Sequence, residues 1–283
     1  MPRSSLVSFA IPLALALAPS VAEAARPCAH SGGPTAVYPG DPNWTADARA
    51  SASGFISAAN PRSGNASLQL GTTGDLFDWA FYLRAAPPGG YGLLSQLDCL
   101  AFDWFRESVV SPTSDVPWDA QSPVLRLLIN DGGVESELVW EKYYTDASAT
   151  INDQWIDQDL MGQNFWRVLP GQGYTIAGCL QADPFFPNPL LTYSLSGWST
   201  SSCYTGQAYV AAVSVGVGSA WPREYRGYVD NVRLGFAGQS GFAVNDNFEL
   251  TPVPEPGTIG LLATGLAGIV GAGLIRRRRQ RGQ

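Results

Sequence analysis

The sequence predicts an all-β domain, a jelly-roll β-sandwich, followed by a single C-terminal transmembrane helix. Three observations lead to this prediction. Gly and Pro make up 52 of the 283 residues, about 18% against roughly 12% in average proteins. Short alternating runs of apolar and polar residues recur between turns, and residues 25–252 contain no long stripe of helical periodicity. One stretch near the C-terminus, 257–275, carries no charge.

Residues 1–24 have the features of a secretory signal peptide. Arg3 precedes a mainly apolar stretch, 6–18, and Ala22 and Ala24 form an Ala-x-Ala cleavage site. A membrane anchor is the alternative, but an apolar stretch this short, interrupted by a proline, cannot span a bilayer. We therefore expect export, with cleavage after Ala24, and a β-sandwich ectodomain over residues 25–252.

Four cysteines, Cys28, Cys99, Cys179 and Cys203, all lie in the expected ectodomain. An even number in an oxidising compartment predicts two disulfides, with three connectivities open. The Pro-, Ser- and Gly-rich stretch between Cys179 and Cys203 favours that pair. The remaining pair, Cys28 with Cys99, would hold the new N-terminus against a central strand. Free thiols are the alternative.

Ten segments between turns have the pattern of β-strands. They are residues 66–70, 78–83, 97–105, 124–129, 137–140, 155–160, 165–169, 209–217, 227–236 and 242–250. The turn sequence Asn-Asp-Gly-Gly at 130–133 predicts a hairpin between the fourth and fifth. This number of short strands is typical of a sandwich, most simply a jelly roll.

Two of these strands place a carboxylate among apolar residues. A period of two puts Asp230 on one face with Tyr228, Val232 and Leu234, and the same reasoning applies to Asp246 in 242–250. A buried carboxylate must be hydrogen-bonded, paired or metal-bound. Calcium held by Asp230 is one hypothesis, because Ca²⁺ takes scattered oxygen ligands. The alternative is an Asp that accepts from backbone amides or pairs with an Arg.

Catalysis and nucleic-acid binding have little support. Residues 25–252 carry 22 Asp and Glu against 11 Lys and Arg, so they lack the basic surface that nucleic acid requires. The single histidine, His30, lies near the new N-terminus, which we expect to be too mobile for a catalytic base. Paired carboxylates for glycoside hydrolysis are the remaining alternative. The candidates are Asp98, Asp103, Glu135, Glu137 and Glu224.

Tryptophan offers another route to function, because sugars stack on exposed indole rings. Trp118, Trp198 and Trp221 lie in Pro-, Ser- and Gly-rich stretches outside the expected strands. They are candidates for a ligand-binding platform, and the alternative is that each covers the core as a lid. A third possibility, ice binding, would need regularly spaced Thr residues, and none is visible.

The C-terminal segment 253–283 combines three features in a fixed order. Val253 and the triplet Pro254-Glu255-Pro256 come first, the uncharged span 257–275 follows, and a basic cluster ends the chain. The basic residues are Arg276, Arg277, Arg278, Arg279 and Arg281. The span is long enough to cross a bilayer, and the arginines place the tail in the cytoplasm. The residues before each proline are extended, so the triplet is a stiff peptide at the membrane surface.

This tail resembles the PEP-CTERM proteins of Gram-negative bacteria, over residues 253–281 alone. The resemblance implies that an exosortase recognises the triplet, removes the anchor and delivers the protein to the cell surface or the exopolysaccharide matrix. Before processing, the C-terminal helix holds the protein in the inner membrane. The alternative is that the triplet is only a stiff linker in front of a permanent anchor.

The middle of the chain resembles carbohydrate-binding-like and laminin-B-like jelly rolls. The resemblance lies in residues 228–234, 81–83 with 86–88, and 127–133, and covers about a third of the domain. It implies a fold rather than a ligand. We therefore expect a non-enzymatic surface or matrix protein that binds extracellular polysaccharide or has a structural role. A secreted polysaccharide-active enzyme is the main alternative.

Overall fold

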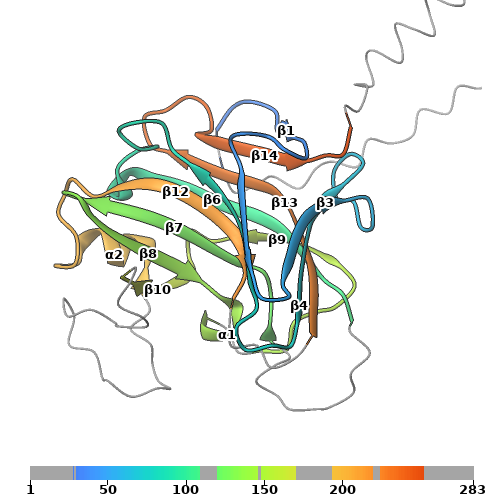
Figure 1. Ribbon diagram of the computed structural model, residues 1–283. Coiled ribbons are helices and arrows are strands. Elements are labelled where there is room, and N and C mark those ends of the chain that lie inside the picture. Colours follow the sequence, from blue (N-terminus) through green and yellow to red (C-terminus); the bar gives the residue numbers. More distant parts are fainter. Residues whose placement is uncertain are drawn as a thin grey trace, which may run out of the picture.

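The computed structural model describes residues 28, 30–108, 120–145, 148–169, 193–218 and 224–251. They form two seven-stranded sheets that pack face to face (Figure 1). The predicted all-β sandwich is therefore confirmed. Within these ranges no helix is long and apolar enough to span a membrane. The predicted signal peptide and transmembrane helix lie outside the described residues.

Sheet 1 is built around the longest strand, β13. One side of β13 pairs with β4 and β14, and the other side pairs with β6. Its strands are β1 (Thr35–Val37), β3 (Ser53–Ser57), β4 (Ser67–Thr73), β6 (Leu97–Arg106), β9 (Trp155–Asp159), β13 (Glu224–Phe236) and β14 (Val244–Phe248). All pairs are antiparallel except β1 with β14.

Sheet 2 is entirely antiparallel, in the order β11-β10-β8-β7-β12-β5-β2. Its strands are β2 (Thr45–Arg49), β5 (Trp79–Ala85), β7 (Val124–Asp131), β8 (Val134–Trp140), β10 (Asn164–Val168), β11 (Tyr193–Ser194) and β12 (Tyr209–Val217). The chain crosses between the sheets repeatedly, for example from β4 to β5 and from β5 to β6, as in a jelly roll.

The helical elements are short. They are η1 (Leu94–Gln96), α1 (Lys142–Thr145) and α2 (Leu195–Thr200). Ser194 caps α2 by accepting a hydrogen bond from the backbone N–H of Gly197 at 3.2 Å. Their lengths agree with the absence of helical periodicity in the sequence.

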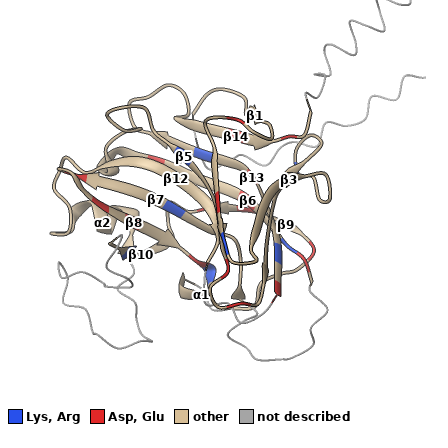
Figure 2. Ribbon diagram, viewed as in Figure 1, with Lys and Arg blue, Asp and Glu red and all other residues tan. Residues whose placement is uncertain are grey.

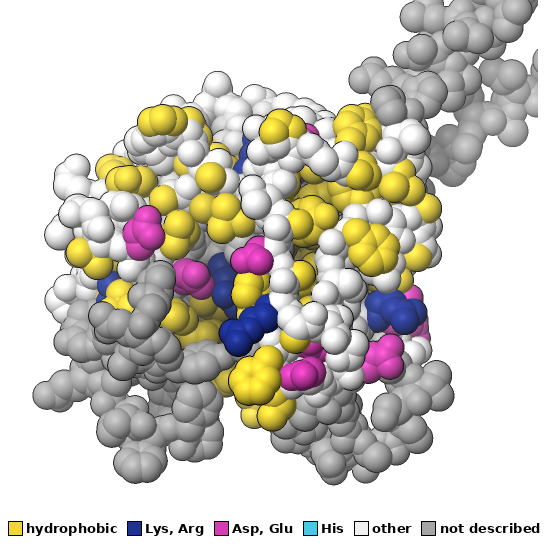
Figure 3. Space-filling model, viewed as in Figure 1, with side chains coloured by type: hydrophobic (Ala, Val, Ile, Leu, Met, Phe, Trp, Pro, Cys, Tyr) yellow, Lys and Arg dark blue, Asp and Glu magenta, His cyan; other side chains and the backbone are white. Residues whose placement is uncertain are grey.

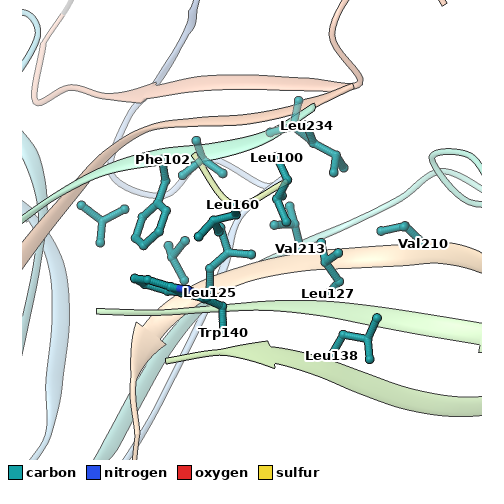
Figure 4. Close-up of a cluster of buried hydrophobic side chains, with 14 of the residues drawn as sticks. Leu100, Phe102, Leu125, Leu127, Leu138, Trp140, Leu160, Val210, Val213 and Leu234 are labelled. Carbon is teal, nitrogen blue, oxygen red and sulfur yellow. The ribbon is translucent and has the colours of Figure 1, made fainter. Parts of the chain in front are cut away.

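The core lies between the sheets, where the inward residues of both interdigitate. Sheet 1 contributes Leu100, Phe102 and Leu234, and sheet 2 contributes Leu127 and Trp140 (Figure 4). Each of these side chains is at most 1% exposed. This inward alternation fixes which residues of sheet 2 face outward, and hence the composition of its outer face.

The predicted hairpin at 130–133 is present between β7 and β8. Gly132 and Gly133 have φ of 63° and 90°, a left-handed geometry that glycine adopts at low cost. The Asn130 side chain accepts from the Gly133 amide at 3.0 Å. The turn chemistry therefore sets the register of the two strands.

The predicted facing of β13 is wrong in its first half. Asn231 has a left-handed φ of 51°, and the pairing with β6 shifts between Asp230 and Arg233. This bulge reverses the alternation. Val229 and Val232 both face the core, so Asp230 faces the opposite side of the sheet from Val232.

Candidate functional site

Most of the predicted sorting and processing residues lie outside the described residues, and those assignments stay predictions. These residues are Ala22, Ala24, Val253, Pro254, Glu255, Pro256, Arg276, Arg277, Arg278, Arg279 and Arg281. The same holds for Cys179, Trp118 and Trp221.

Trp198 is not a platform for a ligand. It is 1% exposed in α2, and its indole N–H donates to the Phe165 carbonyl oxygen at 2.8 Å. Its ring packs against Tyr193 and Tyr204. The short helix turns the indole onto the core, so the lid alternative is correct for this residue.

Asp230 is fully buried, but its carboxylate is held by the backbone. The amide N–H groups of Ser63, Asn231 and Phe248 donate to it at 3.1, 2.9 and 2.9 Å. Burial raises the pKa of Asp230 to about 7; these donors oppose the rise, and the charge of Asp103 adds to it. Among the described residues no three His, Cys, Asp or Glu are grouped to hold a metal ion. Calcium at Asp230 stays a prediction.

Asp246 is also buried, on the core face as predicted, and it pairs with an arginine. Arg84 of β5 and the Trp44 indole N–H both donate to its Oδ2, the latter at 2.7 Å. Burial raises the pKa of Asp246, against the lowering effect of Arg84. The ion pair joins the two sheets, because Arg84 belongs to sheet 2 and Asp246 to sheet 1.

The Cys28–Cys99 disulfide is present, with the Cα atoms 5.1 Å apart. Cys203 is disulfide-bonded as well. The expectation of a mobile N-terminus is wrong at His30. Its side chain is 7% exposed, and its Nε2 lies 2.7 Å from Asp98 Oδ1. The neighbouring disulfide and close packing on Gly235 hold it in place.

The five acids considered for hydrolysis do not form one site. Asp98 and Asp103 lie on β6, Glu135 and Glu137 on β8, and Glu224 on β13. Asp103 is buried in sheet 1, where Arg62 and Arg233 donate to it. Only the two acids of β8 share a strand face in sheet 2.

The outer face of sheet 2 carries the candidate site. Residues that pair directly across antiparallel strands lie on the same face. One such row contains Thr45, Leu83, Ser214, Arg126, Val139 and Trp166. The next row contains Asp47, Phe81, Gly216 and Val124. Arg126 therefore stands in the middle of this face, and Phe81 lies in the next row, two strands away across β12.

The Phe81 ring lies across the neighbouring strand. A Cβ atom at Gly216 would overlap this ring and the Ala80 carbonyl oxygen, so the absence of a side chain at Gly216 leaves room for it. Trp79 stacks beside Phe81, with ring centroids 5.2 Å apart and an interplanar angle of 26°. Both rings are half-buried, and together they form an aromatic platform.

Arg126 bridges this platform and a carboxylate. Its Cζ lies 3.9 Å from the centroid of the Phe81 ring, a cation–π geometry. Its Nη1 lies 3.3 Å from Glu137 Oε2. Its Nε is buried and has no hydrogen-bond partner within the described residues. The ring and the carboxylate thus fix the orientation of the guanidinium.

A second acid stands at the end of β8. Glu141 continues the outward alternation of Glu137 and Val139. Burial raises its pKa to about 7, although the charge of Arg126 opposes this rise. Near neutral pH the Glu141 carboxyl group is therefore partly protonated.

The surface over this face is hollowed, with charged side chains beside apolar ones (Figure 3). Basic and acidic positions lie on β7 and β8 (Figure 2). Aromatic faces, a planar donor and carboxylate acceptors are the groups that bind a polyhydroxylated ring. This face therefore brings aromatic, donor and acceptor groups together.

Analysis of the sequence did not identify Arg126, Trp79 or Glu141 as site residues. One feature of the sequence could have indicated the site, because Arg126 is the single charged residue in the apolar run 124–129. Phe81 and Glu137 were noted, but for other reasons. Assembly of the site depends on the order of β5, β12, β7 and β8, which the sequence does not show.

Comparisons with known proteins gave structural similarity only at a low level. No protein-family model and no curated protein matches the chain. A family 11 carbohydrate-binding module of a cellulosomal cellulase of Clostridium thermocellum aligns with a TM-score of 0.37 and 14% identity, covering 69% of this chain and 88% of that one. A xylan-binding domain of carbohydrate-binding module family 22 aligns with a TM-score of 0.37 and 13% identity, covering 70% and 89%.

A β-1,2-glucanase from Parabacteroides distasonis aligns with a TM-score of 0.36 and 12% identity, covering 69% of this chain but 23% of that one. At these TM-scores the similarity carries no inference about ligand or activity. The assignment of the described residues to the β-sandwich class rests on their own two sheets and the core between them.

Proposed function

We propose that this domain binds a neutral polysaccharide on the outer face of sheet 2. One observation carries the proposal: the Arg126 guanidinium lies between the Phe81 ring and the Glu137 carboxylate. A sugar that packs against the edge of this Trp79–Phe81–Arg126 stack would present its hydroxyl groups to the guanidinium and to the Glu137 carboxylate. The acids Asp47, Glu135 and Glu137 outnumber the bases Arg49 and Arg126 on this face, so an anionic chain would be repelled.

Affinity electrophoresis tests the proposal. The full chain is run through gels that contain mixed-linkage β-glucan, xylan or laminarin, with pectin as the acidic comparison. We expect at least one neutral polysaccharide to retard the wild type and Arg126→Gln to lose that retardation. Arg226→Gln is the matched control, because Arg226 is a half-exposed arginine of sheet 1 paired with Glu107. Equal retardation of all three proteins, or of none, would overturn the proposal.

A polysaccharide-active enzyme is the second candidate, and Glu141 is the observation that favours it. A carboxyl group with a pKa of about 7 can serve as the general acid that glycoside hydrolysis needs. Release of reducing ends by the purified chain, abolished in Glu141→Gln, would put the enzyme first. Retention of polysaccharide without turnover supports the binding module.

The proposal places the domain outside the cell. In this proposal the predicted signal peptide directs export, the predicted helix over 257–275 holds the chain in the inner membrane, and an exosortase removes the tail. Replacing Glu255 with Ala should then leave the full-length protein in the inner membrane on cell fractionation. A mutant that loses its tail at the normal rate would reduce the triplet to a linker.

A further inference from the structure

A second cavity lies at the end of β5, apart from the outer face of sheet 2. Its volume is about 590 Å³, within the roughly 300–1,000 Å³ of small-molecule sites. Arg84, Tyr91, Asn43 and Gln239 line it, together with small apolar residues from the loops that follow β5 and β13. Leu83 faces outward, and Arg84, the next residue of β5, faces the other side of sheet 2. The cavity and the outer-face site therefore lie on opposite sides of this strand.

The ion pair across the sandwich fixes Arg84 at the wall of this cavity. Asp246 is 1% exposed, and its Oδ2 accepts from both Arg84 and Trp44. The Arg84 side chain is 22% exposed, so part of the guanidinium reaches the cavity while the rest is anchored. A planar donor held in this way needs little ordering when a ligand binds.

Tyr91 and Gln239 are also held in place. The Tyr91 hydroxyl donates to the Ala85 carbonyl oxygen at 3.1 Å, which turns its ring into a fixed wall. The Gln239 amide nitrogen donates to the Tyr91 carbonyl oxygen at 3.0 Å, leaving its Oε1 as an acceptor. The Asn43 amide nitrogen donates to Asp41 at 2.9 Å, which likewise leaves its Oδ1.

The charge around the cavity is balanced. Asp246 compensates Arg84, and Asp41 is close enough to raise the pKa of Asp246 by its charge. An anionic ligand would therefore gain little from the guanidinium and would meet two carboxylates. A neutral ligand with several hydroxyl groups satisfies the donor and both amide oxygens, and its apolar face can pack on Tyr91.

We propose that this cavity is a second, end-on site that binds the terminal unit of a neutral saccharide. The Arg84–Asp246 pair lies at its inner wall, and a volume of about 590 Å³ suits a short saccharide end rather than the interior of a long chain. On the outer face of sheet 2, in contrast, the partly exposed Phe81, Arg126 and Glu137 belong to three different strands, a spread that suits the interior of a chain. The two sites would let one domain hold two different parts of a glycan.

The test is a nuclear magnetic resonance titration of the full, isotope-labelled chain in detergent micelles. The probes are cellobiose, laminaribiose, xylobiose and lactose, with galacturonic acid as the anionic comparison, each to about 10 mM. We expect at least one neutral disaccharide to shift the Arg84 Nε–H and Gln239 side-chain signals. Gln239→Trp fills the cavity and should weaken that binding at least tenfold. Gln154→Trp, at an exposed site before β9, should not.

The Phe81→Ala variant separates this inference from the proposed function. It removes the aromatic platform but leaves the cavity intact, so the shifts of Arg84 and Gln239 should persist in it. Absence of these shifts with every neutral disaccharide, or persistence of the Arg84 shift in Gln239→Trp, would overturn the second site. Shifts with galacturonic acid alone would replace it with an anion site and overturn the neutral class.

Discussion

Asp230 makes the stability of the domain depend on pH in a direction that can be calculated. Its pKa is about 7 in the folded protein, against an ordinary value of 3.8. The folded state therefore holds a proton that the unfolded chain releases between about pH 4 and pH 7. The contribution of Asp230 to the free energy of unfolding is therefore largest below pH 4. It is lost as the pH rises through 7.

The magnitude follows from the size of the pKa difference. Three pKa units correspond to about 4 kcal/mol, since one unit is worth about 1.4 kcal/mol. The Asp230 side chain is fully buried, so little of this is lost to solvent screening. Chemical denaturation at pH 5 and pH 8 should therefore show that the wild type is clearly more stable at pH 5. Most of the 4 kcal/mol should be lost between pH 5 and pH 8.

The Asp230→Asn variant isolates this contribution, because all other titrating groups are shared. Its amide oxygen still accepts from Asn231 and Phe248, while the Ser63 N–H loses its acceptor, a cost of about 1–3 kcal/mol. We expect a much flatter difference between pH 5 and pH 8 in the variant. An unchanged pH dependence would refute the assignment of the proton to Asp230.

Three further predictions concern packing. Trp198→Ala should lower the free energy of unfolding by about 3–5 kcal/mol, seen in denaturant titrations, while polysaccharide retention stays normal because the indole is buried. Replacing both Cys28 and Cys99 with Ser should cost about 2–5 kcal/mol; an unchanged denaturation midpoint would contradict this. Gly216→Val should destabilise the domain by about 1–3 kcal/mol and abolish the retention of the protein by polysaccharide. Gly206→Val is the control, because an added Cβ there has no atom within 4 Å, and it should have neither effect.

The sequence predicted the central strands well, because they alternate and end at turns. The predicted segment 209–217 coincides with β12, and 97–105 differs from β6 by one residue. The edge strands β1, β2 and β3 were missed. Every residue of β2 is exposed, so no apolar alternation marks it. Propensity and periodicity detect burial, and an edge strand with little burial leaves no pattern.

The candidate site was less predictable for two physical reasons. The bulge at Asn231 shifted the facing of Asp230; Asn adopts a left-handed φ more readily than most residues, but its presence alone does not mark a bulge. Arg126, Phe81 and Glu137 lie on three different strands, and only the pairing order of sheet 2 brings them together. Strand order is a long-range property, so inspection of single segments could not find this site.

Binding through the Phe81 ring tests the central claim most directly. Isothermal titration of the full chain with the neutral polysaccharide that retards it in gels should show at least a tenfold loss of affinity in Phe81→Ala. Loss of one aromatic contact costs about 1–3 kcal/mol in complexes with nucleic-acid bases, and the variant also releases Arg126 from the ring. Phe55→Ala, which removes a 46% exposed phenylalanine from β3 of sheet 1, should bind like the wild type. If Phe81→Ala binds as tightly as Phe55→Ala, the outer face of sheet 2 is not the polysaccharide site.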